Sequence, residues 1–192
     1  MKKMFLSFCL VFLLAPAVLA KPNDDQEFIV KAGIQPQSTA SFADKKYDTN
    51  IGISAGFEYF KYFGNIFAAG AGAVYDLPRK FKDKDIDSSI SFIPMYAGVK
   101  IRTPLESLNN NYAFLSGRIG YSAFMYKDID SISSSSGGLY YGVGLGVSID
   151  YLVLEALYSI SNYSYKVKPP LGDETFNERY CTISIYAGFK FE

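Results

Sequence analysis

The sequence predicts an all-β fold in which eight antiparallel strands close into an up-and-down barrel. Three observations lead to this prediction. Apolar and polar residues alternate with a period of two in eight segments, aromatic residues make up 17% of the chain, and 16 glycines punctuate it. A period of two places successive side chains on opposite faces of a strand. Start and stop signals for helices are scarce, so strands account for most of the expected structure.

The eight segments are long enough to cross a membrane as tilted strands. Such strands need about 9 to 11 residues, and most of the segments reach that length. In chain order, the predicted strands are residues 28–35, 49–60, 66–76, 89–102, 112–126, 138–150, 151–161 and 179–191.

The N-terminal residues have the pattern of a secretory signal peptide. Lys2 and Lys3 precede an apolar run over residues 4–15, and small residues end at Ala20. About 12 apolar residues are too few for a spanning helix, which needs roughly 20. We therefore expect cleavage after Ala20, which leaves residues 21–192 as one barrel domain with a single cysteine, Cys181.

The connections between the predicted strands alternate between long and short. Polar stretches at residues 36–48, 77–88, 127–137 and 162–178 follow the odd-numbered strands. Residues 61–65, 103–111 and a turn at 150–151 follow the even-numbered ones. Membrane barrels have short periplasmic turns and long extracellular loops. The order here predicts four extracellular loops and periplasmic termini.

The two faces of the strands differ in a way that favours a membrane barrel. In residues 138–150, one face is Leu, Tyr, Val, Leu, Val and Ile, and the other is mainly glycine and serine. Glycine weakens a strand unless a large group approaches it closely. In a narrow eight-stranded barrel, glycines make room for large side chains from other strands. The apolar face is therefore predicted to meet lipid, and the glycine-rich face to line the lumen.

Isolated charges also lie on the predicted lumenal face. They are Lys31, Glu58, Lys100, Arg102, Arg118, Glu155 and Lys190. Because an unpaired buried charge is costly, we expect Glu58 and Glu155 to pair with Lys100 and Arg118 in a lumenal network. The alternative is that water in the lumen solvates these charges.

Three predicted strands end in the same pattern of Ala-Gly-apolar-charged-apolar, at residues 55–59, 97–101 and 187–191. In the predicted topology these endings lie on the periplasmic side. Their outward residues would form a lipid-facing band, with Glu58, Lys100 and Lys190 pointing inward. The residues of the band are Phe57, Tyr59, Val99, Ile101, Phe189 and Phe191.

With its signal peptide, eight alternating strands, inward charges and Phe-rich end, the chain resembles small eight-stranded outer-membrane proteins. This group includes the OmpA transmembrane domain, OmpX and the opacity proteins. The resemblance implies a place in the bacterial outer membrane, among its lipids. It also implies a structural or adhesive role, with the loops contacting a host or surface ligand. It further implies an assembly signal, read by the barrel insertion machinery, at Tyr186, Phe189 and Phe191, although Glu192 follows the last aromatic residue.

The composition argues against several kinds of chemistry. The chain has no histidine, which excludes histidine-activated serine catalysis and zinc sites with histidine ligands. Asp83, Asp85 and Asp87 alternate with other residues, but the glycine and terminal glutamate of a calcium loop are missing. A formal net charge of zero gives no sign of nucleic-acid binding. We predict no catalytic residue, cofactor or metal.

Two other functions compete with a closed structural barrel. One is a narrow pore or a transport barrel for hydrophobic solutes. The other is a soluble periplasmic carrier like a lipocalin, which also has eight strands but carries a Gly-X-Trp marker, and this chain has no Trp. Aromatic residues in the predicted loops would form an interfacial girdle or contact a partner. They are Phe42, Tyr47, Phe81, Tyr163, Tyr165 and Phe176.

Overall fold

The computed structural model describes residues 25–42, 45–83, 88–104, 111–127, 132–167 and 175–191. These residues form nine β-strands. The strands are β1 (Gln26–Phe42), β2 (Lys45–Asp48), β3 (Gly52–Phe63), β4 (Phe67–Lys80), β5 (Ser89–Pro104), β6 (Tyr112–Lys127), β7 (Ile132–Ile149), β8 (Leu152–Val167) and β9 (Thr175–Phe191). No helix in these ranges is long and apolar enough to cross a membrane. The predicted signal peptide lies outside the described residues.

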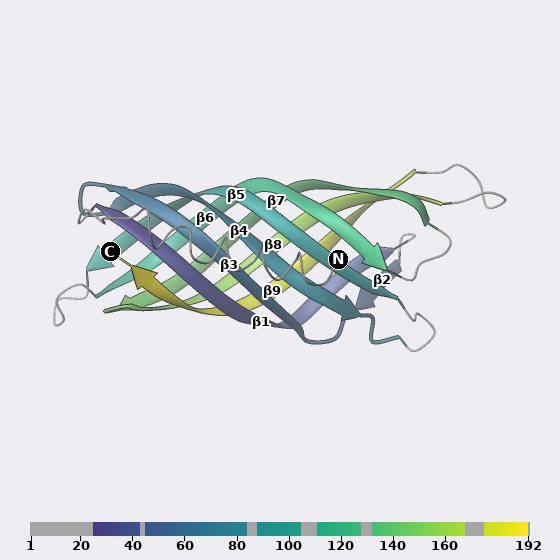
Figure 1. Ribbon diagram of the computed structural model, residues 1–192, viewed down its shortest axis with the longest axis horizontal. Coiled ribbons are helices and arrows are strands. Elements are labelled where there is room, and N and C mark those ends of the chain that lie inside the picture. Colours follow the sequence, from purple (N-terminus) through teal and green to yellow (C-terminus); the bar gives the residue numbers. More distant parts are fainter. Residues whose placement is uncertain are drawn as a thin grey trace, which may run out of the picture.

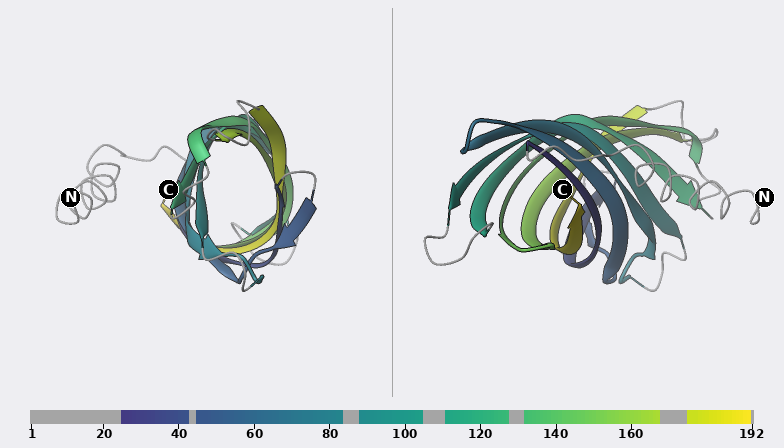
Figure 2. Two further views of the ribbon diagram at one scale, coloured as in Figure 1. Left: turned by 90° about the vertical axis from the view of Figure 1, so that its right-hand side faces the viewer. Right: turned by 60° about the vertical axis from the view of Figure 1, so that its left-hand side comes forward.

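Eight of the strands close into an antiparallel barrel. From β3 to β9, each strand pairs with its sequence neighbour, and β1 closes the ring by pairing with both β3 and β9. The strands tilt along the barrel, and the end-on view shows a closed ring (Figures 1 and 2). The short strand β2 folds back on the far end of β1. The predicted all-β eight-stranded barrel is confirmed.

The connections differ between the two ends of the barrel. At one end, where β1 begins and β9 finishes in Figure 1, tight turns join β3 to β4 and β7 to β8. Each turn needs a left-handed residue, Gly64 with φ 73° and Asp150 with φ 49°. At the other end β8 and β9, yellow-green to yellow, still run side by side (Figure 1), paired as far as Lys166↔Thr175.

Burial alternates along the strands as the sequence predicts. In β9, every second residue from Glu178 to Lys190 is buried, and the residues between them are exposed or half-buried. Leu145 of β7 is 67% exposed although its side chain is fully apolar, and Glu58 of β3 is 1% exposed although it carries a charge. This is the reverse of a soluble protein and the arrangement of a barrel in lipid.

Several strands extend further toward the long-loop end than predicted. β8 continues to Val167, β9 begins at Thr175, and β1 runs to Phe42. Much of the predicted loop at residues 162–178 is therefore strand, paired in register from Asn162↔Arg179 to Lys166↔Thr175. The alternation of outward and inward residues persists there, but the outward residues are polar instead of aliphatic. The sequence pattern of a lipid-facing strand therefore stops before the strand does.

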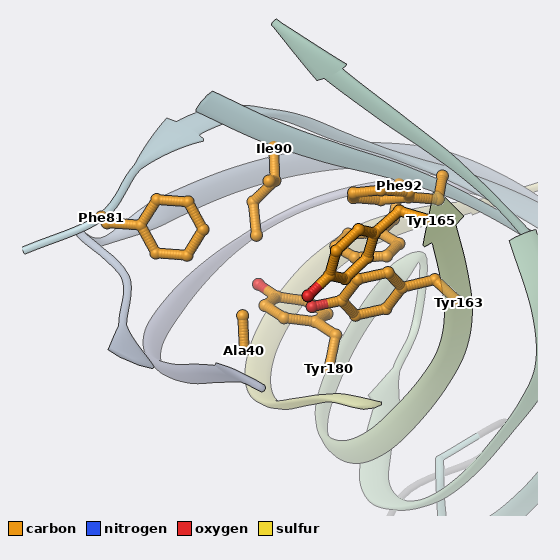
Figure 3. Close-up of a cluster of buried hydrophobic side chains, with 8 residues drawn as sticks. Ala40, Phe81, Ile90, Phe92, Tyr163, Tyr165 and Tyr180 are labelled. Atoms are coloured by element: carbon orange, nitrogen blue, oxygen red, sulfur yellow. The ribbon is translucent and has the colours of Figure 1, made fainter. Parts of the chain in front are cut away.

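The predicted role of the loop aromatics is wrong for three of them. Phe81, Tyr163 and Tyr165 are 5% or less exposed and point into the barrel, where they join Phe92 and Tyr180 (Figure 3). Tyr47 and Phe176 are half-buried and pack against the same cluster. The side chain of Phe42 is not among those described. The three buried residues fill the outer end of the lumen instead of forming a girdle. Tyr163 and Tyr165 do so because β8 continues with the same inward-facing alternation, and Phe81 directly follows β4.

Candidate functional site: the lumenal charge network and aromatic cluster

Arg118 of β6 lies between two carboxylates at the middle of the lumen. Its Nη2 is 2.7 Å from Glu58 Oε1, on β3, and 2.6 Å from both carboxylate oxygens of Glu155, on β8. These three side chains are 3% or less exposed. Three strands that are not neighbours in the ring thus meet through one guanidinium, which an eight-stranded barrel is narrow enough to allow.

Lys31 of β1 provides a second cation to the same two carboxylates. Its Nζ donates to Glu58 Oε1 at 2.8 Å and to Glu155 Oε2 at 3.4 Å. Neutral groups also donate hydrogen bonds to the two carboxylates: Tyr96 donates to Glu58 at 2.7 Å and Ser116 donates to Glu155 at 2.8 Å. Two cations therefore face two anions in a buried setting, where charge-assisted hydrogen bonds are strong.

A second polar group lies toward the tight-turn end. Glu27 of β1 accepts hydrogen bonds from Tyr62 at 2.9 Å, from Tyr112, and from Lys100 Nζ at 3.4 Å. Lys100 also lies over the ring of Phe60, 4.0 Å from its centroid. This group places one ion pair and three aromatic rings in the lumen, on the tight-turn side of the Arg118 network.

The structure brings together three of the four charges that the sequence placed in a network. Glu58, Arg118 and Glu155 are in contact, whereas Lys100 pairs with Glu27 instead of either predicted glutamate. The sequence places Lys31 on the lumenal face but does not predict its part in the network, where it pairs with Glu58. Glu27 was missed because it precedes the first predicted strand, although its alternation with Ile29 and Lys31 could have extended that strand.

Polar and aromatic side chains also occupy the long-loop end of the lumen. Gln35 donates to Asp76 at 2.6 Å, and Arg79 donates to Ser38 at 3.1 Å. Beyond them the rings of Phe92 and Tyr180 stack with centroids 4.5 Å apart (Figure 3). Stacking of this kind adds to the stability that burial of each ring provides.

Inward glycines make room for these large groups, as the narrow barrel requires. A Cβ added to Gly98 would lie 3.2 Å from the Phe60 ring, and one added to Gly146 would lie 2.4 Å from the Phe114 ring. One added to Gly144 would lie 2.7 Å from both Glu155 Oε1 and Ser116 Oγ.

The C-terminal aromatics divide between the two faces of β9. Phe189 and Phe191 are 51% and 44% exposed and face outward. Tyr186 is buried, and Lys31 Nζ lies 4.4 Å from its ring centroid. Cys181 is half-buried on the outward face.

The described residues contain no group of three or more His, Cys, Asp or Glu side chains that could hold a metal ion. Asp85 and Asp87 of the sequence's aspartate repeat lie outside the described residues.

A closed barrel with an aliphatic exterior and a charged, filled interior defines the class of bacterial outer-membrane β-barrels. The family model described as "Outer membrane protein beta-barrel domain" matches residues 7–191, and the chain belongs to that family. Its location is therefore the bacterial outer membrane, in contact with lipid. Comparison with curated protein sequences finds no match.

Solved structures share the fold at low sequence identity. Neisserial surface protein A is 18% identical with a TM-score of 0.56, and the match covers 85% of this chain and 97% of that one. Ail of Yersinia pestis is 19% identical, TM-score 0.49, covering 87% and 99%. OprG of Pseudomonas aeruginosa is 14% identical, TM-score 0.48, covering 88% and 97%.

The soluble-carrier alternative is excluded by these findings. A lipocalin-like carrier would expose its charges and enclose an apolar cavity. Here the aliphatic residues of β7 are outside, and Glu58, Arg118 and Glu155 are inside.

Proposed function

We propose that this protein is a non-enzymatic, closed outer-membrane barrel whose extended strands and loops form a binding surface outside the cell. One observation carries the proposal, namely that side chains fill the lumen at three successive levels. These are the Glu27–Lys100 group, the Arg118 network and the aromatic cluster around Phe92 and Tyr180. A solute would have to displace buried ion pairs to pass, and breaking one such pair costs about 3–5 kcal/mol.

The described residues of β8 and β9 beyond the membrane remain paired, which supports their use as a binding surface. β8 and β9 stay paired up to Lys166↔Thr175, and Tyr165 stacks on Phe176 with centroids 5.3 Å apart. The chain has thus built structure beyond the membrane that a lipid-spanning barrel alone does not need. We assign adhesion or another surface interaction to this extension and its neighbouring loops.

Electrical recording of the purified protein in a planar bilayer tests the closed state. We expect no steady openings from the wild type at moderate voltage. A double variant, Glu58→Ala with Glu155→Ala, removes both carboxylates of the network and should give intermittent conductance. Steady, large openings from the wild type would refute the proposal.

Transport of small apolar molecules is the second candidate, favoured by the path of two strands. β6 and β7 pair up to Ser122↔Gly138, and the described residues beyond this point, 123–127 and 132–137, have no backbone pairing with each other. Phe124 of the inner aromatic cluster lies two positions after the last residue of β6 that pairs with β7. Proteoliposomes distinguish the candidates: faster entry of a small aromatic hydrocarbon than into protein-free vesicles supports transport, and equal entry supports the closed barrel.

A further inference from the structure

The outward face of β7, β8 and β9 changes abruptly from apolar to polar at one height. On β8, the outward residues are apolar from Leu152 to Ile160, and the next two are Asn162 and Ser164. On β9, they are apolar or weakly polar from Phe191 to Cys181, and the next is Arg179. These outward runs span about 9 to 11 residues, the length that crosses the apolar core of a membrane. The polar residues therefore begin where lipid headgroups begin.

Asn162 and Arg179 are direct partners across the β8–β9 pair. Gly138 of β7 lies beside them, because a Cβ on it would be 2.9 Å from the Asn162 carbonyl oxygen. The outward face of the wall thus presents an arginine and an amide side by side in one row at this height. Above this row, the hydroxyls of Ser136 and Ser164 are 2.8 Å apart and hydrogen-bonded.

A pocket of about 360 Å³ opens on this row. The register of β7 against β8 shifts between Gly137 and Tyr140, at the same height as the pocket. Asn162, Ser164, Asn177 and Arg179 line it from the next two strands. Glu178 also borders the pocket, but it is only 8% exposed and alternates toward the lumen with Tyr180. Tyr163 lines the pocket as well, and it is buried on the lumenal side like Glu178. On the outward side, Arg179 supplies the cation, and Asn162, Ser164 and Asn177 supply amide and hydroxyl groups that can donate hydrogen bonds.

Arg179 is exposed, and no other described residue forms an ion pair or hydrogen bond with its guanidinium. Burying a cation in the headgroup layer without an anion is costly, whereas a guanidinium matches the geometry of a phosphate with two parallel hydrogen bonds. Basic pockets at the membrane surface bind anionic headgroups for this reason.

We propose that this pocket binds the phosphate of a lipid headgroup in the outer leaflet. Arg179 holds the phosphate, Asn162 and Asn177 donate to the surrounding polar groups, and the acyl chains of the lipid lie along Ile160 and Leu139 below. The site lies on the outer wall of the barrel and is independent of whether the lumen conducts.

Native mass spectrometry of the purified full-length barrel in detergent tests this site. The probes are lipid A with its phosphates, the same lipid after dephosphorylation, and inorganic phosphate. We expect the wild type to retain phosphorylated lipid A and to lose the dephosphorylated lipid. Arg179→Gln should weaken retention roughly tenfold, because a hydrogen-bonded charge is removed. Lys46→Gln, which removes an exposed cation on β2, is the matched control and should retain the lipid as the wild type does.

The outcomes separate the competing explanations. Equal retention by Arg179→Gln and the wild type overturns the proposal. Equal weakening by Lys46→Gln shows a diffuse charge effect and also overturns it. Inorganic phosphate that displaces the lipid at equal concentration would assign the site to a soluble anion and refute a lipid site. Heat-dependent gel mobility confirms that each variant is a folded barrel.

Discussion

At the scale of single residues, Glu155 links the two cations of the lumenal network. It accepts hydrogen bonds from Arg118 at 2.6 Å, Ser116 at 2.8 Å and Lys31 at 3.4 Å, and is 4% exposed. Buried pairs contribute little net stability compared with a well-packed apolar core, but removing one partner leaves the other charge without compensation. The network is therefore sensitive to loss of any one member.

Glu155→Ala should reduce the free energy of unfolding by about 3–5 kcal/mol, because Arg118 and Lys31 then share only Glu58. Asp83→Ala, at an exposed position beyond β4, should change it by less than about 0.5 kcal/mol. Thermal unfolding in detergent, followed by circular dichroism and gel mobility, measures both. Equal unfolding temperatures for the two variants would contradict a structural role of Glu155 in the lumen.

The sequence predicts the face of each charge but not its height in the barrel. A period of two assigned Lys100 to the lumen, and it lies there. Its partner depends on how far each strand is staggered along its neighbour, which alternation does not encode. Lys100 consequently lies at the height of Glu27, and the second cation beside Glu58 and Glu155 is Lys31 instead of Lys100.

At the scale of elements, β7 is the strand that lets the network form. Its inward residues Gly142, Gly144 and Gly146 face the side chains of neighbouring strands, including Glu155 and Phe114. Glycine is unfavourable in a strand interior, so three of them at alternate positions require compensation. The missing side chains leave space for Glu155, Ser116 and Phe114, and the contacts of these residues compensate for the unfavourable glycines.

Gly144→Ala should destabilise the barrel by about 1–3 kcal/mol, because the added methyl group would lie 2.7 Å from Glu155 Oε1 and displace it. Gly117→Ala is the matched control on the outward face of β6, where the added Cβ would lie 3.4 Å from Val99 Cγ2, an ordinary contact. It should change stability by less than about 0.5 kcal/mol. Unfolding in urea at fixed lipid content measures both, and a similar loss for the two variants would show that the lumenal contact is unimportant.

The lengths of the elements were only partly predictable. The membrane-spanning part of β8 was assigned because aliphatic residues mark its outward face as far as Ile160. Beyond that point Asn162 and Ser164 face outward while Tyr163 and Tyr165 face inward, so the polarity of the pattern inverts but the strand continues. Apolar outward residues mark a strand only as far as the membrane surface. The extracellular extension of β8 is therefore evident only from its pairing with β9.

At the scale of the whole molecule, the barrel is completed by pairing its last strand with its first. β9 pairs with β1 from Phe28↔Phe191 to Ala40↔Tyr180, with one irregularity. Phe28 contacts Phe191 on one side and Phe57 of β3 on the other, with ring centroids 6.2 and 6.3 Å apart. Phe57 and Phe191 therefore make similar contacts with Phe28 beside the β1–β9 pairing, but only Phe191 belongs to the C-terminal strand.

Substituting Phe191 and Phe57 in turn distinguishes an assembly signal from a structural contact. Phe191→Ala should lower the amount of folded barrel in the outer membrane, because the insertion machinery would lose the aromatic that we propose it reads, with Phe189 beside it. Phe57→Ala removes the equivalent contact with Phe28 but leaves β9 intact, so its membrane level should stay near that of the wild type. Quantitative immunoblotting of outer-membrane fractions, with heat-dependent gel mobility to identify folded barrel, measures both.

Refolding in detergent, without the insertion machinery, supplies the control for stability. Both phenylalanines face lipid, so each variant should refold and lose less than about 1 kcal/mol of stability. Tyr186→Ala is expected to act differently, because that ring is buried against Lys31 and its loss should destabilise the refolded barrel itself. If Phe191→Ala and Phe57→Ala reduce the membrane level equally, the C-terminal aromatic acts through packing at the seam and not as a signal.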